Sequence, residues 1–325
     1  MFDVIPYSKE HRNEWNTFVA QSKNGTFLFD RGYMDYHADR FHDASLMVYD
    51  QRGRLFALLP ANRVGESLYS HQGLTYGGLV IGAKATASNV CEFMIAINEY
   101  LRSADVTTVV YKAVPYIYDA MPADEPLYAI TEVSHARLCN RDIASVISLA
   151  SRIPFAELRH RGQKKAMRCG VTIGFSDDFG TFWRILVDNL QTKYGAKPVH
   201  TLNEMLLLRN QFPGNIRLLA AFRDGQMVAG SVLYVTPQVV KTQYISASSE
   251  GKAVGALDLL FAWLFDNLAE ASETTETPGI GGRPQFVDLG TSALDHSTEL
   301  RRPLIFQKEG FGARAVCYDT YEWNL

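Results

Sequence analysis

The sequence has little of what marks a metalloprotein or a disulfide-bonded domain. Its four cysteines, Cys91, Cys139, Cys169 and Cys317, are far apart, and none belongs to a Cys-x-x-Cys pair. Zinc sites and disulfide frameworks both need cysteines at closer and more regular spacing. We therefore expect no bound metal, and unpaired cysteines are typical of a reducing compartment.

Long hydrophobic runs are also missing. The longest, from Leu259 to Phe265, is far shorter than the roughly 20 apolar residues that span a bilayer. The N-terminus lacks a basic segment followed by an apolar one, so no secretory leader is predicted. We expect a cytoplasmic protein without a membrane span.

Neither sign of charge is in excess. The 32 Lys and Arg residues against 35 Asp and Glu residues give a formal net charge of −3. This balance provides no global attraction to nucleic acids or anionic membranes. A polyanionic ligand would therefore have to bind to a local cluster of basic residues.

The strongest pattern that is present lies in the C-terminal half. Leu218–Tyr234 consists of two apolar runs around an Asp224-Gly225 turn, which predicts a β-hairpin. A strand at Val239–Ala247 and a small-residue turn follow, and then a helix from about Val254 to Ala271. With its flanking segments this half predicts the order β-α-α-β-β-β-α-β-α-β. A turn between strand and helix directs backbone N–H groups at whatever lies against it.

The N-terminal half predicts a similar order with little residue-level similarity. It has a hairpin at Leu46–Leu59 with a Gly53 turn, then the Gly-rich segment Gly73–Gly78 and the amphipathic helix Ala87–Arg102. Gly53 and Gly225 are 172 residues apart (225 − 53), which favours a duplicated domain over a short repeat. The alternative is a mixed α/β protein that gives such a string without duplication.

We expect two domains joined by a basic helix: residues 1–145, a linker helix at 146–169, and residues 170–325 with the active site. Five of the ten residues from Arg159 to Arg168 are Arg or Lys. Arg161, Lys164 and Lys165 fall with Arg168 at spacings that bring several charges to one side of a helix. Such a stripe can hold a diphosphate, a polyanionic acceptor or a tRNA backbone. The alternative is a solvated helix face.

Several motifs together resemble those of a known family. They are Tyr76-Gly-Gly-Leu-Val80, Arg161-Gly-Gln-Lys-Lys-Ala-Met-Arg-Cys-Gly-Val171, Val228-Ala-Gly-Ser-Val232, Gln243-Tyr-Ile-Ser-Ala-Ser-Ser-Glu-Gly251, Asp288-Leu-Gly-Thr-Ser292 and Phe306-Gln-Lys-Glu-Gly-Phe-Gly-Ala313. In order and spacing they resemble the FemAB-like branch of the GNAT acyltransferase superfamily, and the resemblance covers nearly the whole chain.

This resemblance implies an α+β fold of two tandem GNAT-like domains, each a mixed, mostly antiparallel sheet flanked by helices. It also implies transfer of an acyl or aminoacyl group from a thioester or a tRNA ester to an amine. Arg161 occupies the matching Arg position of the family's motif, where the resemblance suggests contact with an acceptor's phosphates. The resemblance likewise places Tyr76 among the substrate-binding residues.

Acyl transfer needs a neutral amine, a donor carbonyl at near-attack distance and stabilisation of the developing oxyanion. Backbone N–H groups of a splayed strand can supply that stabilisation without a nucleophilic side chain. This suits a sequence with no convincing Ser/His/Asp or Cys/His arrangement and no Gly-x-Ser-x-Gly elbow.

We expect acyl-coenzyme A as co-substrate, with its phosphates at the turn before the Val254–Ala271 helix. Ser249, Lys252, Gly255 and Ala256 are the candidate binding residues there. In GNAT acetyltransferases this turn commonly reads Arg/Gln-x-x-Gly-x-Gly/Ala, whereas here it reads Lys252-Ala-Val-Gly-Ala-Leu257. The alternative is a helix-start turn with no ligand.

Three residues are candidates for catalysis. Lys308 matches the Lys of a Phe-Lys-x-x-Phe-Gly motif, with Gln307 inserted, and could polarise the donor carbonyl or neutralise a phosphate. Asp288 could bind the acceptor amine or act as a base, the alternative being an Asx-type turn. Tyr244 could donate a proton to the leaving group, the alternative being packing within a strand. For Lys308 the alternative is a solvated lysine near a helix end.

Three functions remain open. The first is an N-acyltransferase with an acyl-coenzyme A-like donor and a small-molecule or glycopeptide amine acceptor. The second is an aminoacyl-tRNA-dependent enzyme that adds amino acids to a cell-wall precursor. The third is a non-catalytic GNAT-like binding module.

Overall fold

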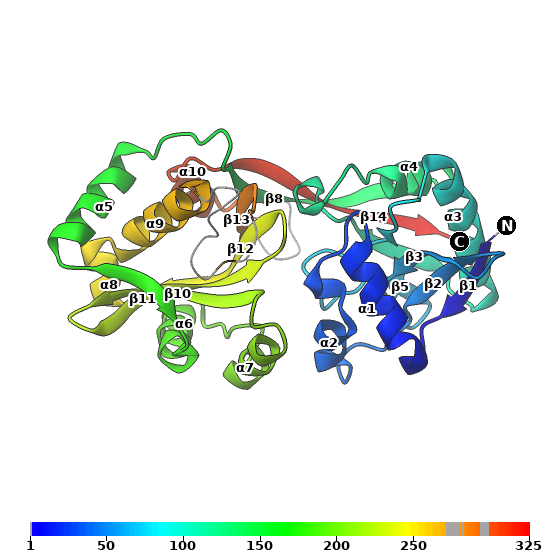
Figure 1. Cartoon of the computed structure of the whole chain (residues 1–325), viewed down its shortest axis with the longest axis horizontal. Coiled ribbons are helices and arrows are strands. Elements are labelled where there is room, and N and C mark those ends of the chain that lie inside the picture. The colour runs from blue at the N-terminus through cyan, green and yellow to red at the C-terminus, as the bar shows by residue number, and fades with distance from the viewer. Residues whose placement is uncertain (1, 271–279, 281–282, 293–298) are drawn as a thin grey trace. The chain divides into compact units, whose positions relative to one another are not determined.

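The computed structural model describes residues 2–270, 280, 283–292 and 299–325. The chain divides into two compact units (Figure 1): unit 1 is Met1–Ile143 with Cys317–Leu325, and unit 2 is Ala144–Val316. The division at 146–169 predicted from the sequence is therefore wrong in two respects. The basic helix belongs to unit 2 and packs on another helix of that unit, and the C-terminal end of the chain belongs to unit 1.

Unit 1 places its helices between short strands. Its strands are β1 (Phe2–Pro6), β2 (Leu46–Asp50), β3 (Leu55–Leu59), β4 (Asn62–Val64), β5 (Ser67–Tyr69), β6 (Val80–Ile81) and β7 (Thr108–Lys112), together with the start of β8 (Arg137–Ser148) and the end of β14 (Arg314–Asn324). Its helices are α1 (Arg12–Gln21), α2 (Arg31–Met34), α3 (Ala87–Ser103) and α4 (Glu125–Glu132), with 3₁₀ turns at Lys9–His11, Phe27–Phe29, Asp35–His37 and Tyr116–Tyr118.

Two strand groups form the sheets of unit 1. One runs β1-β2-β3-β6 and is antiparallel throughout. The other runs β4-β5-β7-β14, in which only β5 and β7 are parallel. The apolar face of α3, with Phe93 and Ile97, packs with Val48, Ala57 and Val109 in the core.

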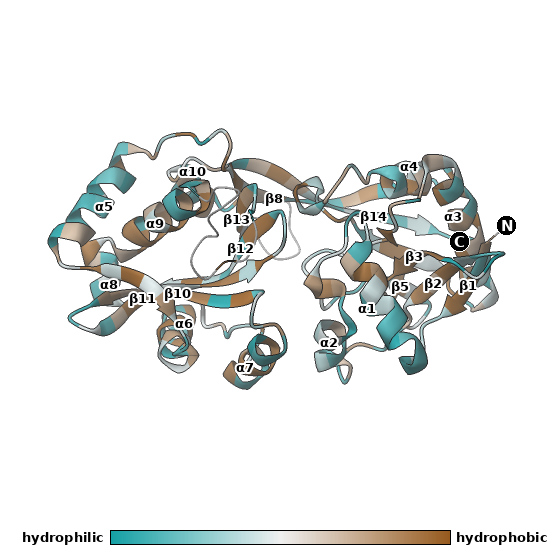
Figure 2. Cartoon of the chain, in the orientation of Figure 1, coloured by the Kyte–Doolittle hydropathy of each residue, from teal (hydrophilic) through white to brown (hydrophobic). Residues whose placement is uncertain are grey.

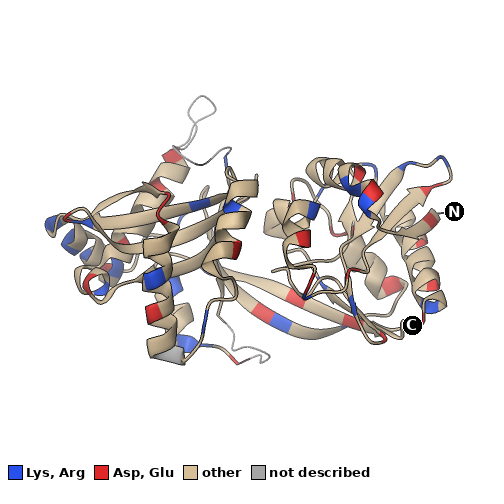
Figure 3. Cartoon of the chain, turned by 90° about the horizontal axis from the view of Figure 1, so that it is seen from below, with Lys and Arg blue, Asp and Glu red and all other residues tan. Residues whose placement is uncertain are grey.

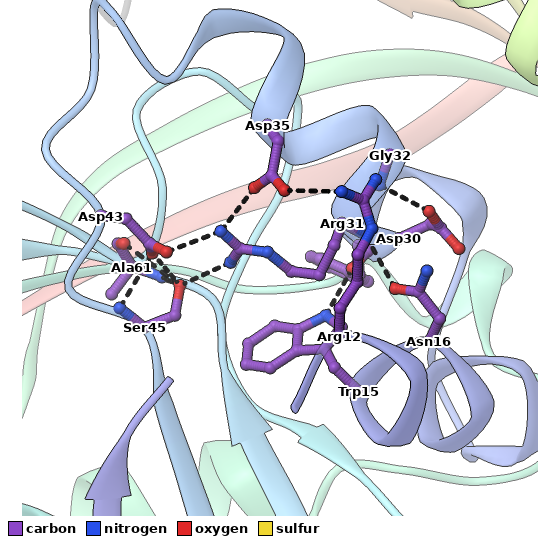
Figure 4. Close-up of polar contacts among 11 residues, drawn as sticks. Arg12, Trp15, Asn16, Asp30, Arg31, Gly32, Asp35, Asp43, Ser45 and Ala61 are labelled. Carbon is purple, nitrogen blue, oxygen red and sulfur yellow. Dashed lines mark hydrogen bonds and ion pairs between the residues drawn. The ribbon is translucent and has the colours of Figure 1, made fainter. Parts of the chain in front are cut away.

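A buried arginine ties α2 to the start of β2. Arg31 is almost fully buried, and its Nη2 donates to Asp35 and to Asp43 at 2.6 Å each (Figure 4). The guanidinium also lies 3.9 Å from the centroid of the Tyr7 ring. A buried charge is tolerated only when it is paired and hydrogen-bonded, so this cluster is an ordered part of the unit 1 core.

Unit 2 follows the order predicted for the C-terminal half. Its strands are the end of β8 (Arg137–Ser148), β9 (Thr172–Ser176), β10 (Ile216–Arg223), β11 (Gln226–Val235), β12 (Val239–Ala247), β13 (Phe286–Thr291) and the start of β14. Its helices are α5 (Glu157–Arg168), α6 (Phe179–Tyr194), α7 (Leu202–Gln211), α8 (Ser249–Val254), α9 (Ala256–Glu270) and α10 (Arg302–Glu309).

The sheet of unit 2 runs β8-β13-β12-β11-β10-β9, and only the β12–β13 pair is parallel. The β10–β11 hairpin turns at Asp224 and Gly225, both with positive φ, as a tight hairpin requires. Both units therefore have the predicted α+β architecture of mixed, mostly antiparallel sheets.

Helices cover both faces of the unit 2 sheet. In Figure 1, α9 lies on one face and α6 and α7 lie on the other, while α5 packs on α9. Leu260, Leu264 and Phe265 of α9 are buried against Leu219 and Leu233 of the sheet. The hydropathy colouring of Figure 2 shows the apolar strands and α9 in brown, whereas α5 carries much of the hydrophilic teal.

Candidate active site

The two parallel strands of unit 2 part near their middle. β12 and β13 pair only from Val239–Phe286 to Lys241–Asp288, although β12 continues to Ala247 and β13 to Thr291. The pairing of β11 with β12 shifts register close to this point: Val232 of β11 pairs with Tyr244, but Leu233 pairs with Thr242. Beyond Lys241, the β12 edge that faced β13 has lost that strand partner, which leaves main-chain groups available to a ligand.

A cavity of about 350 Å³ opens at this point, and we call it the wedge cavity. Its walls come from α6, β12, α8, α9, β13 and α10, so six elements meet around it. The lining residues are Leu186, Asn189, Leu190, Ile245, Ser246, Ala247, Lys252, Leu257, Phe261, Leu289, Leu304, Gln307, Lys308 and Phe311. Most of them are apolar, which is typical of a small-molecule pocket with a few placed polar groups.

One polar group of the wedge cavity is centred on Asn189 of α6. Its amide donates to the Ser246 hydroxyl and to the Ala247 carbonyl, both at 2.6 Å. Its carbonyl oxygen accepts a hydrogen bond from the Lys252 ammonium. Asn189 therefore fixes the exposed Lys252 at the cavity wall, where a cation can meet an anionic part of a ligand.

The second polar group is Lys308 of α10, which is buried. Its ammonium donates to the carbonyls of Gly290 and Thr291 at 2.8 Å each, and to the Ser292 hydroxyl at 3.0 Å. Burial lowers the pKa of Lys308 to about 8, with Asp288 opposing the shift and Lys241 adding to it. The prediction that Lys308 lies at the site is consistent with its place on the cavity wall, and the alternative of a solvated lysine is wrong.

Asp288 is not placed to handle an acceptor amine. It is fully buried, its Oδ2 lies 3.0 Å from the Lys241 ammonium, and its Oδ1 accepts from the Gly290 amide at 2.7 Å. The prediction of a base is thus corrected to the alternative of a turn-forming aspartate. Asp288 thus pairs with Lys241, whereas Lys308 is held by neutral oxygens.

Tyr244 lies in β12 directly before the cavity residue Ile245. Its hydroxyl is 2.6 Å from Nδ1 of His200 and accepts from the His200 amide at 3.2 Å. Its ring packs edge-on against Trp183. Tyr244 itself is not among the lining residues, so its role as proton donor stays a prediction, now with His200 as its hydrogen-bonding partner.

The predicted phosphate turn is largely wrong. Residues Ser249–Val254 form α8, and Gly255, with φ +79°, ends it before α9 begins at Ala256. A Cβ on Gly255 would lie 2.7 Å from the Gly162 carbonyl, and Ala256 is fully buried. Both positions thus serve the close approach of α5 to this helix junction.

Two members of the predicted turn remain accessible. Ser249 is exposed at the start of α8, and Lys252 reaches the wedge cavity. The sequence pattern located the right segment but placed the glycine in a turn where the structure has a helix end.

The predicted substrate-binding residues lie elsewhere. Arg161, Lys164 and Lys165 are exposed on α5, and none of them lines the wedge cavity. Tyr76 is buried in the core of unit 1, next to the rings of Phe29 and Tyr118, and its hydroxyl is 3.1 Å from that of Thr26. Tyr76 is therefore a packing residue.

Unit 1 closes the equivalent gap. Its parallel strands β5 and β7 pair from Ser67–Thr108 to Tyr69–Val110, and the chain then stays bonded to β7. Ser70 and Gly77 donate to the carbonyls of Val110 and Lys112, and the Leu79 amide donates to the Tyr111 hydroxyl. A Cβ on Gly77 would lie 1.6 Å from the Ser70 carbonyl. In unit 1 the Gly-rich segment thus occupies the position beside the parallel strand pair that the wedge cavity occupies in unit 2.

Sequence reasoning missed several cavity residues. Asn189, Leu186 and Leu190 lie on α6, whose apolar spacing predicted a helix but not the side of the sheet that it covers. The sequence did hold one signal for this site: Asn189 is a polar residue one helical turn from Leu186, on an otherwise apolar face. His200 was missed because nothing in the sequence links it to Tyr244.

Within the described part of the chain, no cluster of three or more His, Cys, Asp or Glu side chains could hold a metal ion. A search of the same residues for a membrane-crossing helix found none with the required length and hydropathy.

Comparisons with known proteins identify the fold. No family model matches the chain, and no curated protein matches it in sequence. Among solved structures, the chain is similar to FemX, with a TM-score of 0.68 at 10% identity over 99% of this chain and 97% of that one. It is also similar to the C-terminal domain of a putative lysylphosphatidylglycerol synthetase from Agrobacterium fabrum (TM-score 0.59, 14% identity, 97% and 92% covered).

A third similar structure is a tandem GNAT protein from the clavulanic acid biosynthesis pathway, with a TM-score of 0.55 at 12% identity over 100% of this chain and 98% of that one. The chain thus has the FemAB-like tandem fold of the GNAT superfamily, as the motifs predicted. At these identities the likeness defines the fold and leaves the reaction to the chemistry of the site.

Proposed function

We propose that the protein is an N-acyltransferase that binds an activated, acyl-coenzyme A-like donor in unit 2 and passes the acyl group to an amine. The observation that carries the proposal is the wedge cavity, opened where β12 leaves β13. The closed gap of unit 1 supports the assignment of the donor to unit 2 alone. A small-molecule or glycopeptide amine remains the proposed acceptor, in a cytoplasmic setting.

The reaction follows from the geometry of the cavity. The amine nitrogen attacks the donor carbonyl, a C–N bond forms as the C–S bond breaks, and the proton lost by the amine ends on the leaving thiolate. Negative charge develops on the carbonyl oxygen, and amides of the parted β12 edge can donate to it. Tyr244 is our candidate for delivering the proton to the thiolate.

Lys308 adds an electrostatic contribution. Its ammonium is held by neutral oxygens, and no carboxylate among the described residues forms an ion pair with it. In a cavity lined mainly by apolar side chains such a charge acts more strongly on an oxyanion than it would in water. Asp288 contributes by fixing the turn that holds Lys308, not by accepting a proton from the amine.

The residues present fit the two halves of a coenzyme A thioester differently. The apolar cavity suits the acyl group and the chain next to the sulfur. For the phosphates, Lys252 is an exposed cation at the wall, while Gly255 and Ala256 are taken up by helix packing. We therefore expect affinity to rest more on the thioester end than on the diphosphate.

Isothermal titration with acetyl-coenzyme A and longer acyl homologues tests the proposal. We expect saturable binding by at least one homologue, weakened by Lys252→Ala. Gln307→Ala provides a control, because Gln307 lines the same cavity without carrying charge. If none of the homologues binds, acyl-coenzyme A is excluded as the donor.

An aminoacyl-tRNA donor is the second candidate. It is supported by the similarity in fold to FemX and by the exposed basic side chains of α5. Gel retardation by charged tRNA at two salt concentrations separates it from the first, since phosphate contacts weaken steeply with salt. The third candidate, a non-catalytic binding module, predicts that the wild type has no turnover and that Lys308→Ala and Asp288→Ala therefore change none.

A further inference from the structure

The helix α5 presents two very different faces. Its inner face has small residues at the contacts with the α8–α9 region: Ala166 is fully buried, and a Cβ on Gly162 would lie 1.8 Å from the Asp258 carboxylate. Arg159 also faces inward and pairs with Asp258 at 2.8 Å. The inner contacts of the helix thus use small residues and the Arg159–Asp258 ion pair.

The outer face is strongly cationic. Arg161, Lys164, Lys165 and Arg168 are all exposed, while the one acidic residue of α5 is Glu157 at its start. Arg161 and Glu157 are 3.8 Å apart and both well exposed, so water screens their pair. Figure 3 shows the blue cluster of this helix at one end of unit 2. This local charge contrasts with the whole chain, whose formal charge is −3.

Large apolar side chains stand beside these cations. Leu158 is 53% exposed and Phe306 of α10 is 70% exposed. Both line a surface groove of about 300 Å³ that is separate from the wedge cavity. The two elements are tied together where the Ala156 amide donates to the Gly310 carbonyl at 2.8 Å. An exposed leucine and phenylalanine that line one groove beside a basic stripe form an amphipathic surface.

We propose that this face of unit 2, formed by Leu158, Phe306 and the four cations, docks the protein on an anionic phospholipid surface. Cations attract the headgroups, and the two apolar side chains enter the boundary between headgroups and acyl chains. The alternative occupant, RNA, would satisfy the cations but would leave Leu158 without an apolar partner. This inference does not depend on the proposed transfer reaction, because the face lies outside the wedge cavity.

Flotation of the full chain with vesicles tests the inference. The vesicles are pure phosphatidylcholine, or phosphatidylcholine with about one third phosphatidylglycerol. We expect binding to the anionic vesicles, little binding to the neutral ones, and loss of binding at high salt. The double variant Lys164→Glu/Lys165→Glu should bind about tenfold more weakly or worse, since each cation near an anionic surface contributes measurably.

A matched control separates local from global charge. Lys9→Glu/Lys84→Glu changes the net charge by the same amount at two exposed positions of unit 1, and it should bind as the wild type does. Leu158→Ser/Phe306→Ser should also weaken binding while keeping the melting temperature, because both side chains are exposed. Absence of vesicle binding, equal losses in the two charge variants, or retention by an RNA oligonucleotide without vesicle binding would each overturn the proposal.

Discussion

At the scale of single residues, buried charge gathers close to the wedge cavity. Lys241 and Lys308 are both buried, and Asp288 is the carboxylate between them. A buried charge that is not matched by a counter-ion costs stability, so its presence on a cavity wall points to a ligand that carries or develops negative charge.

We expect Lys308→Met to lower turnover about a hundredfold, the usual effect of losing one group that stabilises an oxyanion. Donor binding, measured by titration calorimetry, should change little, because the charge matters chiefly when the oxyanion forms. Gln307→Ala serves as the control from the same helix. Turnover of Lys308→Met close to that of the wild type would contradict the assigned role.

A second residue-scale prediction concerns acid stability. Burial lowers the pKa of His71 to about 3, with the neighbouring His37 adding to the shift. Below about pH 6.5 the His71 side chain binds a proton in the unfolded state but stays neutral in the folded state. The free energy of unfolding is therefore unaffected by His71 above about pH 6.5 and decreases as the pH falls towards 3. Burial also lowers the pKa of His37, whose ring stacks on that of His71 with the centroids 5.3 Å apart.

His71→Asn should therefore flatten the loss of unfolding free energy between about pH 7 and pH 4, measured by urea unfolding. Asparagine is chosen because His71 has φ +66°, which asparagine tolerates. His135→Asn is the control, since His135 also has positive φ but is exposed. An unchanged acid slope in His71→Asn would show that other groups set it.

At the scale of elements, the junction of α5, α8 and α9 depends on glycine. Gly255 has φ +79°, and a side chain there would meet the Gly162 carbonyl at 2.7 Å. We expect Gly255→Ala to lower the free energy of unfolding by about 2 kcal/mol or more, from backbone strain and from displacement of α5. Denaturant unfolding measures it, and Gly214→Ala, where nothing lies within 4 Å, should be nearly neutral.

Elements with strong local signals were predictable from the sequence. The Asp224-Gly225 hairpin formed as expected because its turn needs residues that accept positive φ. The pattern at Lys252–Leu257 gave the wrong local structure, since a glycine that ends a helix and one that opens a phosphate turn look alike in sequence. Lys308 and Lys252 were found by motif, but Asn189 was not, because its partners Ser246 and Ala247 are far away along the chain.

At the scale of the whole molecule, the two units exchange strands at their boundaries. β8 follows the N-terminal half but ends paired with β13 of unit 2, and β14 follows the C-terminal half but ends paired with β7 of unit 1. The sequence could not show this, because a strand's pattern reports burial and not the identity of its neighbour. The predicted boundary failed for that reason.

Trp323→Ala should for the same reason weaken unit 1, although it lies at the end of the chain. Trp323 is buried in the core of unit 1, and its indole N–H donates to Asn98 of α3 at 3.3 Å. We expect a loss of about 3–5 kcal/mol, seen as faster hydrogen exchange in β7 and α3. Phe306→Ala, at an exposed aromatic of unit 2, is the control, and exchange that accelerates in unit 2 alone would contradict the exchange of strands.

The most direct measurement of the central claim is donor binding by a protein whose wedge cavity has been filled. Leu257→Trp adds bulk inside the cavity, and Ala83→Trp adds the same aromatic group to an unrelated pocket of unit 1. Titration with the best acyl-coenzyme A homologue should show binding to the wild type and to Ala83→Trp but none to Leu257→Trp, with all three folded. Equal binding by the two tryptophan variants would place the donor outside the gap between β12 and β13 and contradict the account.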